Sequence, residues 1–227
     1  MPTVLVTGGG SGIGAEICRT LAAAGWRAVA ADIRPPEGGW ELDTTDEAGW
    51  DRVLDAVWPL DGLVNCAGIR DRAPIAKMEL GQFERMMDIH VVGCFLGIRG
   101  VARRWAAENR GGAVVNISSV TATQAVAGQI HYVTAKGAVA ALTRAAATEL
   151  AGSGTRVNAI APGIIRTPMT ADRLGDPAQT AWLLSRVPAG RVGEPHEIAS
   201  VVQFLLSDAA SYVNGVLLPV DGGWAAS

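Results

Sequence analysis

The chain lacks an excess of positive charge, which limits the partners that it can bind. Its 227 residues include 19 Lys and Arg against 22 Asp and Glu, for a formal net charge of -3, and no Lys/Arg-rich run stands out. Nucleic acids and anionic membrane surfaces are bound largely through such cations. The charge balance therefore argues against both kinds of partner.

Long apolar segments and paired cysteines are missing too. No stretch reaches the ~18 apolar residues that span a bilayer. The N-terminus passes from Pro2 into Val4–Val6 without the basic flank and apolar core of a signal peptide. Cys18, Cys66 and Cys94 are scattered, with no pair at metal-ligand spacing. We therefore expect a cytoplasmic protein with reduced thiols, no metal site and no membrane association.

Short β-branched runs alternate with Ala-rich stretches along the chain, which is typical of βαβ units. Hydrophobic residues make up 49% of the sequence, enough for one sizeable core. We predict a single α/β domain over residues 1–227, a doubly wound parallel sheet of about seven strands with helices on both faces. Pro35–Gly39 and Thr167–Val192 are expected to be irregular. The expected strands are Val4–Val6, Ala28–Ala31, one near Trp40–Leu42, Gly62–Val64, Ala113–Ile117, Val157–Ile160 and Val216–Val220; the expected helices are Gly12 to about Ala24, Gln82 to about Asn109, Tyr132 to about Leu150 and Pro195 to about Leu206.

A glycine-rich turn joins the first expected strand to the first expected helix. It reads Thr7-Gly8-Gly9-Gly10-Ser11-Gly12-Ile13-Gly14. Glycines let the backbone approach a pyrophosphate, and the free N–H groups at a helix start attract its charge. Many glycine-rich loops are ordinary turns, but this position between strand and helix favours nucleotide binding.

Asp32 ends the second expected strand, close to the ~20-residue separation from such a turn that is typical of an acid on the adenosine ribose. A carboxylate accepts hydrogen bonds from ribose hydroxyls and repels a 2′-phosphate, which favours NAD over NADP. Two alternatives stay open. Asp32 could simply start a turn, and Arg34 could bind a phosphate, which would make NADP possible.

Tyr132 and Lys136 stand four residues apart in one expected helix, so both side chains lie on one face. A neighbouring ammonium favours the phenolate of tyrosine, which can accept the proton of an alcohol. Such pairs are common on helix surfaces, so the pair alone is weak evidence. Ser119 follows the strand Ala113–Ile117, at the end where ligands bind in this architecture. Chemistry alone does not separate it from Ser118.

These motifs together resemble the short-chain dehydrogenase/reductase family. The glycine turn has that family's G-x-x-x-G-x-G spacing, and Ser119, Tyr132 and Lys136 match its Ser-x12-Tyr-x3-Lys signature, which selects Ser119 over Ser118. The resemblance implies a Rossmann-type fold, and Thr44 and Cys66 are departures from the family pattern. The other matching segments are Asp43-Thr44, Asn65-Cys66-Ala67-Gly68, Pro162-Gly163-Ile164-Ile165-Arg166-Thr167 and Asp221-Gly222-Gly223.

The resemblance also implies which residues form the site. Ser119 would orient the substrate oxygen, Tyr132 would transfer the proton, and Lys136 would lower the pKa of that tyrosine. The family's fourth catalytic position falls on His90, where the family usually has Asn. The implied cofactor-binding residues are Gly8, Ser11, Gly12, Ile13, Gly14, Asp32, Asp43, Thr44, Asn65, Ala67, Gly68, Tyr132, Lys136, Pro162, Ile165 and Thr167.

His90 leaves two interpretations open. In the family, the main-chain carbonyl at this position holds a water that links the lysine to solvent, so we expect His90 to act chiefly through its backbone. An imidazole titrates near pH ~6.5, so the side chain could instead shuttle protons itself.

The predicted function is NAD-dependent hydride transfer between nicotinamide and a secondary alcohol or ketone. Met169, Leu174, Trp182, Leu183 and Leu184 predict an apolar lid, and hence a hydroxysteroid, hydroxyacyl or similar substrate. The alternatives are an NADPH-dependent 3-oxoacyl-type carbonyl reductase and a nucleotide-binding regulator without turnover. The resemblance further implies a homotetramer, or a homodimer, built on the two long helices.

Overall fold

One sheet of seven parallel strands organises the protein, which is described over residues 1–226 by a computed structural model. Ser227, the last residue of the expected domain, lies outside the described residues. The strand order is β3-β2-β1-β4-β5-β6-β7, so the direction of winding reverses between β1 and β4. The strands are β1 (Thr3–Thr7), β2 (Arg27–Asp32), β3 (Trp40–Glu41), β4 (Gly62–Asn65), β5 (Ala113–Ile117), β6 (Arg156–Pro162) and β7 (Leu217–Val220).

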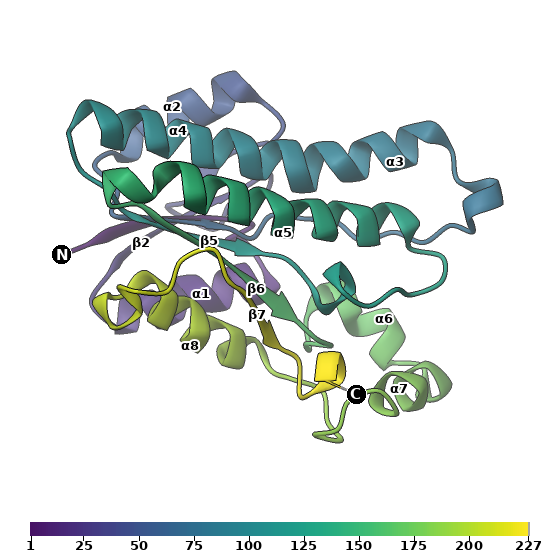
Figure 1. Ribbon diagram of the computed structural model, residues 1–227. Coiled ribbons are helices and arrows are strands. Elements are labelled where there is room, and N and C mark those ends of the chain that lie inside the picture. The colour runs from purple at the N-terminus through teal and green to yellow at the C-terminus, as the bar shows by residue number, and fades with distance from the viewer. Residues whose placement is uncertain (227) are drawn as a thin grey trace.

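Helices cover both faces of the sheet (Figure 1). One face carries α1 and α8, which pack against each other, and the other carries α2, α4 and α5. A π-helical turn, Asp88–Val92, joins α3 to α4 so that the two form one long rod. The helices are α1 (Gly12–Ala23), α2 (Glu47–Val57), α3 (Leu80–Met87), α4 (Gly93–Ala107), α5 (Ile130–Leu150), α6 (Ala171–Leu174), α7 (Pro177–Leu184) and α8 (Pro195–Leu206).

The central strands are buried on both faces, as their continuous apolar sequences require in a parallel sheet. Every residue of β1, β4 and β5 is buried. On the side of α2 and α4, two tryptophan side chains fill the core, and the ring N–H of each donates a hydrogen bond. Trp105 Nε1 donates to the Leu60 carbonyl (2.7 Å), and Trp50 Nε1 donates to the Thr44 carbonyl (2.9 Å). This packing fixes α4 on the sheet.

The predicted fold class is confirmed, with a doubly wound parallel sheet between two helical layers. The segment Pro35–Gly39 carries no helix, as expected. The prediction that Thr167–Val192 is irregular was wrong, because α6 and α7 lie within it. Helix α7 begins where Asp176 accepts hydrogen bonds from the backbone N–H groups of Ala178 and Gln179, which is a regular N-cap.

Helix α2 was not predicted from the sequence. It starts at an N-cap aspartate, Asp46, whose carboxylate accepts from the Ala48 N–H (3.1 Å). The expected strand near Trp40–Leu42 is present as β3, and α2 then forms the crossover from β3 to β4. This face of the sheet is therefore covered by a regular helix.

Three absences hold for the part of the chain that the structure describes, residues 1–226. No helix is long and apolar enough to cross a bilayer. No group of three or more His, Cys, Asp or Glu side chains is arranged to hold a metal ion. The three cysteines form no disulfide.

Because Trp105 is 1% exposed and hydrogen-bonded, Trp105→Ala should lower the free energy of unfolding by about 3–5 kcal/mol. Tyr212→Ala is the matched control, since the Tyr212 side chain is fully exposed and its loss should change stability by no more than about 0.5 kcal/mol. Urea unfolding followed by circular dichroism measures both. A loss below about 1 kcal/mol for Trp105→Ala would show that α4 does not depend on this side chain.

Candidate active site

A cavity of about 690 Å³ opens at the carboxyl ends of the strands, where the winding reverses. Open α/β sheets bind ligands at this point. Its lining comes from the glycine turn, from the segments that follow β2 to β6, and from α3, the π-helical turn, α5, α6 and α7. One continuous hollow therefore joins the nucleotide-binding motif to the predicted catalytic residues.

The glycine turn is packed too tightly for side chains. A Cβ atom on Gly14 would lie 2.1 Å from the Gly8 carbonyl oxygen, and Gly8 and Gly12 have positive φ angles of 68° and 52°. Ser11 is the N-cap of α1 but makes no side-chain capping bond, and the first turn carries no acidic residue. The helix start thus presents backbone N–H groups and a positive dipole end to the cavity, which suits a pyrophosphate.

Asp32 lines the cavity at the end of β2 and is held by two backbone groups. Its carboxylate accepts from the N–H of Gly10 (3.1 Å) and from the N–H of Arg34 (3.0 Å). The two bonds fix the carboxylate beside the glycine turn. The Arg34 side chain is exposed, also lines the cavity, and forms no salt bridge among residues 1–226.

The segment after β4 is anchored by a threonine that the sequence analysis did not single out. Thr7 Oγ1 accepts from the N–H groups of Cys66 and Ala67, both at 3.1 Å. Cys66 and Ala67 both line the cavity. Burial raises the pKa of the Cys66 thiol to about 12, so this departure from the family pattern adds a neutral group.

Asn65 does not line the cavity, although it was predicted to bind cofactor. Its Nδ2 donates to Asn116 Oδ1 (2.8 Å), and Asn116 Nδ2 donates to Thr143 Oγ1 (2.9 Å). This buried chain links β4, β5 and α5. The other predicted cofactor-binding residues all line the cavity: Gly8, Ser11, Gly12, Ile13, Gly14, Asp32, Asp43, Thr44, Ala67, Gly68, Tyr132, Lys136, Pro162, Ile165 and Thr167.

The structure brings Ser119, Tyr132 and Lys136 into the same cavity. Lys136 Nζ lies 5.6 Å from the centroid of the Tyr132 ring and donates to the Ile117 carbonyl (2.8 Å). The Ser118 hydroxyl donates to the Lys136 carbonyl (2.9 Å) and is therefore engaged in attaching α5 to β5. Ser119 Oγ accepts from the Thr121 N–H, which leaves its own proton free to donate. The geometry supports the choice of Ser119.

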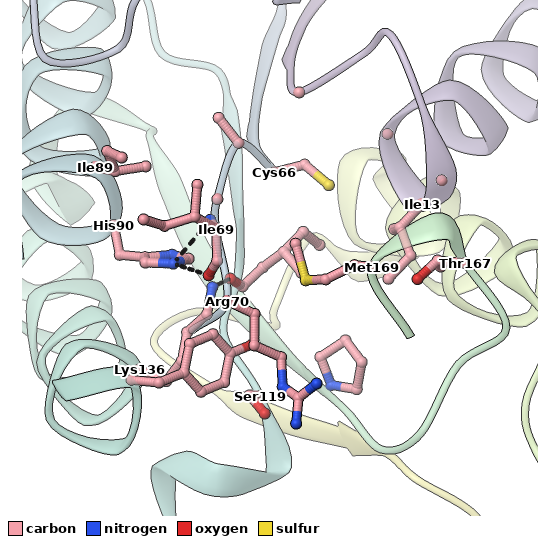
Figure 2. Close-up of a pocket in the computed structure, with 18 of the residues that line it drawn as sticks. Ile13, Cys66, Ile69, Arg70, Ile89, His90, Ser119, Lys136, Thr167 and Met169 are labelled. Atoms are coloured by element: carbon pink, nitrogen blue, oxygen red, sulfur yellow. Dashed lines mark hydrogen bonds between the residues drawn. The ribbon is translucent and has the colours of Figure 1, made fainter. Parts of the chain in front are cut away.

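His90 is buried and packs its ring edge-on against Tyr132, with 5.5 Å between the ring centroids. Its Nε2 lies 2.8 Å from the Ile69 carbonyl and 3.2 Å from the Ile69 N–H, as Figure 2 shows. Burial, and secondly the charge of Lys136, lower the pKa of His90 well below its ordinary value. A Cβ on Gly68 would lie 2.3 Å from His90 Cε1, so the ring requires glycine there.

The residues of the predicted apolar lid divide between the cavity and the surface. Met169 and Leu183 line the cavity, whereas Trp182 is 40% exposed and stacks under the Arg186 guanidinium (3.8 Å). The polar residues in the same cavity that were not singled out from the sequence include Arg70, Gln129 and Arg173.

Comparison with known proteins identifies the family. The family model described as enoyl-(acyl carrier protein) reductase matches residues 8–225. A galactitol 2-dehydrogenase (L-tagatose-forming) of Cereibacter sphaeroides is 40% identical, covering 96% of this chain and 93% of the relative. A cyclopentanol dehydrogenase of Comamonas testosteroni is 36% identical, covering 99% of this chain and 97% of the relative.

Solved structures agree with these sequence relatives. A dehydrogenase structure from Agrobacterium tumefaciens with bound NADP superposes with a TM-score of 0.94 at 38% identity, covering 100% of this chain and 97% of the other. A 4-hydroxyisoleucine dehydrogenase complexed with NADH gives a TM-score of 0.94 at 28% identity, covering 100% of both chains. The chain belongs to the short-chain dehydrogenase/reductase family and is a nicotinamide-dependent oxidoreductase that interconverts alcohols and carbonyl compounds.

Proposed function

We propose that the protein oxidises secondary alcohols, or reduces the corresponding ketones, with NAD rather than NADP. The observation that carries the proposal is the presence of Ser119, Tyr132 and Lys136 in one cavity with the glycine turn and Asp32. A carboxylate fixed beside the glycine turn favours free ribose hydroxyls over a 2′-phosphate. One similar structure contains NADP and another contains NADH. The cofactor preference of this chain must therefore be inferred from its own residues.

The proposed mechanism assigns a separate task to each side chain. A bound nicotinamide would supply the hydride chemistry, which converts the carbinol carbon of the alcohol into the carbonyl carbon of the ketone or the reverse. The Tyr132 side-chain oxygen exchanges the proton of the substrate hydroxyl, and the Lys136 ammonium lies beside the ring, 5.6 Å from its centroid. The free proton of the Ser119 hydroxyl donates to the substrate oxygen and orients it.

The cofactor would be held by the cavity-lining residues of the glycine turn and of the later segments. Backbone N–H groups at the start of α1 would bind the pyrophosphate, and Asp32 the adenosine ribose. Thr167 and the backbone around Ile165 would hold the carboxamide. Thr170 supports this last segment, since its hydroxyl donates to the Ile165 carbonyl (2.6 Å).

The proposed substrate is a secondary alcohol that contacts both apolar and polar side chains of the cavity. Met169 and Leu183 supply the apolar part, which agrees with a ring or chain of carbon atoms. The relatives named for cyclopentanol and for galactitol differ widely in polarity, so they support the reaction more than any one substrate. An NADPH-dependent 3-oxoacyl reductase and a regulator without turnover are the rival functions.

We also infer a homo-oligomer, a tetramer or a dimer, that assembles through the long helices. Val92 and Phe95 are 40% and 45% exposed on the rod of α3 and α4, and Ile130 at the start of α5 is 40% exposed. Apolar side chains gathered on neighbouring helices support an interface there. The cavity itself lies within one chain.

Tyr132→Phe should lower kcat by at least ~10²-fold, because it removes the transferable proton and little volume. Initial rates of NADH formation on a panel of secondary alcohols measure kcat, and fluorescence titration measures the Kd for NADH, which should stay within about twofold. Retention of more than about a tenth of the rate would exclude the proposed role. A wild-type protein that binds NADH but turns over no member of the panel would favour the regulator.

Asp32→Ser should narrow the preference for NAD over NADP, mostly by raising kcat/KM for NADP as the repulsion of the 2′-phosphate is removed. Asp43→Ser is the control, and it should leave the ratio of kcat/KM for NAD and NADP unchanged. Asp43 also lines the cavity, but it is not the residue that ends β2. Steady-state kinetics with both cofactors give the ratio. A wild type that already prefers NADPH would assign the choice to Arg34 and favour the 3-oxoacyl reductase.

His90→Asn should leave kcat within a few-fold and the pH profile unchanged, because the neutral buried ring does not carry protons. The variant should also lose the pH dependence of the free energy of unfolding that the buried His90 ring causes. Since the folded state disfavours the protonated ring, the unfolded wild type binds more protons below pH ~6.5, and its stability falls there as the pH falls. Urea unfolding at several pH values should show a weaker fall in the variant. Loss of most activity near neutral pH, with an inflection near pH ~6.5 disappearing, would instead make the imidazole part of the relay.

A further inference from the structure

Three arginines from two distant segments approach one another around the start of α5. Arg70 and Arg72 belong to the loop after β4, and Arg173 belongs to α6. The amide oxygen of Gln129, the N-cap of α5, faces the first two. With the amide oriented so that its oxygen faces the arginines, the oxygen accepts from Arg70 Nε (3.1 Å), Arg70 Nη2 (2.6 Å) and Arg72 Nε (3.2 Å). One neutral oxygen thus receives three guanidinium hydrogen bonds.

No anion balances this positive charge. Within residues 1–226, none of Arg70, Arg72 and Arg173 forms a salt bridge with a carboxylate. Arg173 Nε is buried and has no hydrogen-bond partner. The nearby Asp71 is turned elsewhere, since it accepts from the Gln82 amide and from the backbone N–H of Arg72.

Burial and mutual repulsion disfavour the charged forms of Arg70 and Arg173. Burial, and then the charges of Arg70 and Arg72, lower the pKa of Arg173 to about 10. Burial and Arg72 also lower the pKa of Arg70. Partly buried like charges without a counter-ion are rare, because desolvation and repulsion both oppose them. Two of the three, Arg70 and Arg173, line the cavity, where an anionic ligand would pair with them.

The loop that carries Arg70 and Arg72 is fixed on both sides of the pair. His90 Nε2 is hydrogen-bonded to Ile69, the residue before Arg70. The backbone N–H of Ala73, the residue after Arg72, donates to the Gly128 carbonyl (3.0 Å). The backbone that carries the two arginines is therefore held in place by the fold.

Arg70 and Arg173 line the same cavity as Ser119 and Tyr132. In Figure 2 the Arg70 side chain reaches into the cavity on the side of Ser119. Arg70 also interacts electrostatically with Tyr132, so it lies at the catalytic part of the cavity. The glycine turn, where a pyrophosphate would bind, is held by Asp32 and belongs to the other part.

We propose that the substrate is a hydroxy acid, a secondary alcohol whose carboxylate is bound by Arg70 and Arg173 while its hydroxyl meets Ser119 and Tyr132. This inference rests on the proposed function and deepens it. A carboxylate offers two oxygens in one plane, which matches the fork of a guanidinium. The carboxylate would supply the negative charge that the neutral Gln129 amide oxygen lacks.

The first test compares matched substrates. Initial rates with NAD are measured for cis-4-hydroxycyclohexanecarboxylate, for its primary amide and for cyclohexanol. The acid should exceed the amide in kcat/KM by about 10- to 100-fold, the size of a charged hydrogen-bonded contact. Equal values for acid and amide would overturn this inference and leave the proposed function intact.

The second test uses variants. Arg70→Met and Arg173→Met should each reduce the acid-to-amide ratio of kcat/KM by about tenfold or more. Arg173→Lys should restore part of it, because it keeps the charge but not the fork. Arg27→Met is the control, since Arg27 is exposed at the opposite end of the sheet and should leave the ratio unchanged. Thermal unfolding of each variant checks that it is folded.

Binding without turnover separates this inference from the proposed function. Calorimetric titration of the protein with NADH bound should give a Kd for cyclohexanecarboxylate that Arg173→Met weakens by about tenfold. If that binding is found but no alcohol is turned over, the anion site stands and the proposed function fails. Tighter binding of cyclohexyl phosphate would overturn the carboxylate assignment. Weaker binding of NADH itself by Arg173→Met would overturn the substrate role and assign the arginine to the cofactor.

Discussion

Three hydrogen bonds fasten α5 to the carboxyl-terminal half of β5, and the geometry of the site depends on them. The strand residues Asn116 and Ile117 and the next residue, Ser118, each bond to α5, through Thr143 Oγ1, Lys136 Nζ and the Lys136 carbonyl respectively. The attachment points span about two turns of the helix, so they fix its rotation as well as its distance from the sheet. Tyr132 lies one turn before Lys136 and must therefore face the cavity.

The same cavity is lined by charged side chains of both signs. Asp32 and Asp43 lie among its lining residues near the glycine turn, whereas Arg70 and Arg173 lie toward the catalytic part. The Asp32 carboxylate would accept hydrogen bonds from the ribose hydroxyls of a bound dinucleotide, whereas the arginines would attract the carboxylate of a bound acid. Because charges act over several ångströms in a partly desolvated space, the two arginines would favour one orientation of the acid before contact is complete.

Local sequence patterns were enough to predict the sheet, the glycine turn and the Ser119, Tyr132 and Lys136 set. Helix α2 was missed although its signals were present, since Asp46 caps it and its buried residues recur at helical spacing: Trp50, Val53, Leu54 and Val57. The Pro- and Gly-rich segment Pro35–Gly39 before it made the crossover read as a loop. Helices α6 and α7 are shorter still, with four and eight residues, too few for a periodic pattern to be read.

The arginine cluster could not be found in the same way. Arg70 and Arg173 are far apart in the sequence, and no motif relates them to each other or to Gln129. Their proximity results from the sheet, which brings the end of β4 and the segment after β6 to one edge. The composition of the predicted lid therefore indicates its apolar residues but not the arginine side chains that the fold brings beside them.

The contact between Gly68 and His90 has a consequence for how this chain can evolve. Because a Cβ on Gly68 would meet the His90 ring at 2.3 Å, a side chain at position 68 is excluded while the imidazole stays in place. The two positions are thus coupled, and the order of substitutions matters. A lineage that first shortens the side chain at position 90 releases position 68 to vary, whereas the reverse order passes through a strained intermediate.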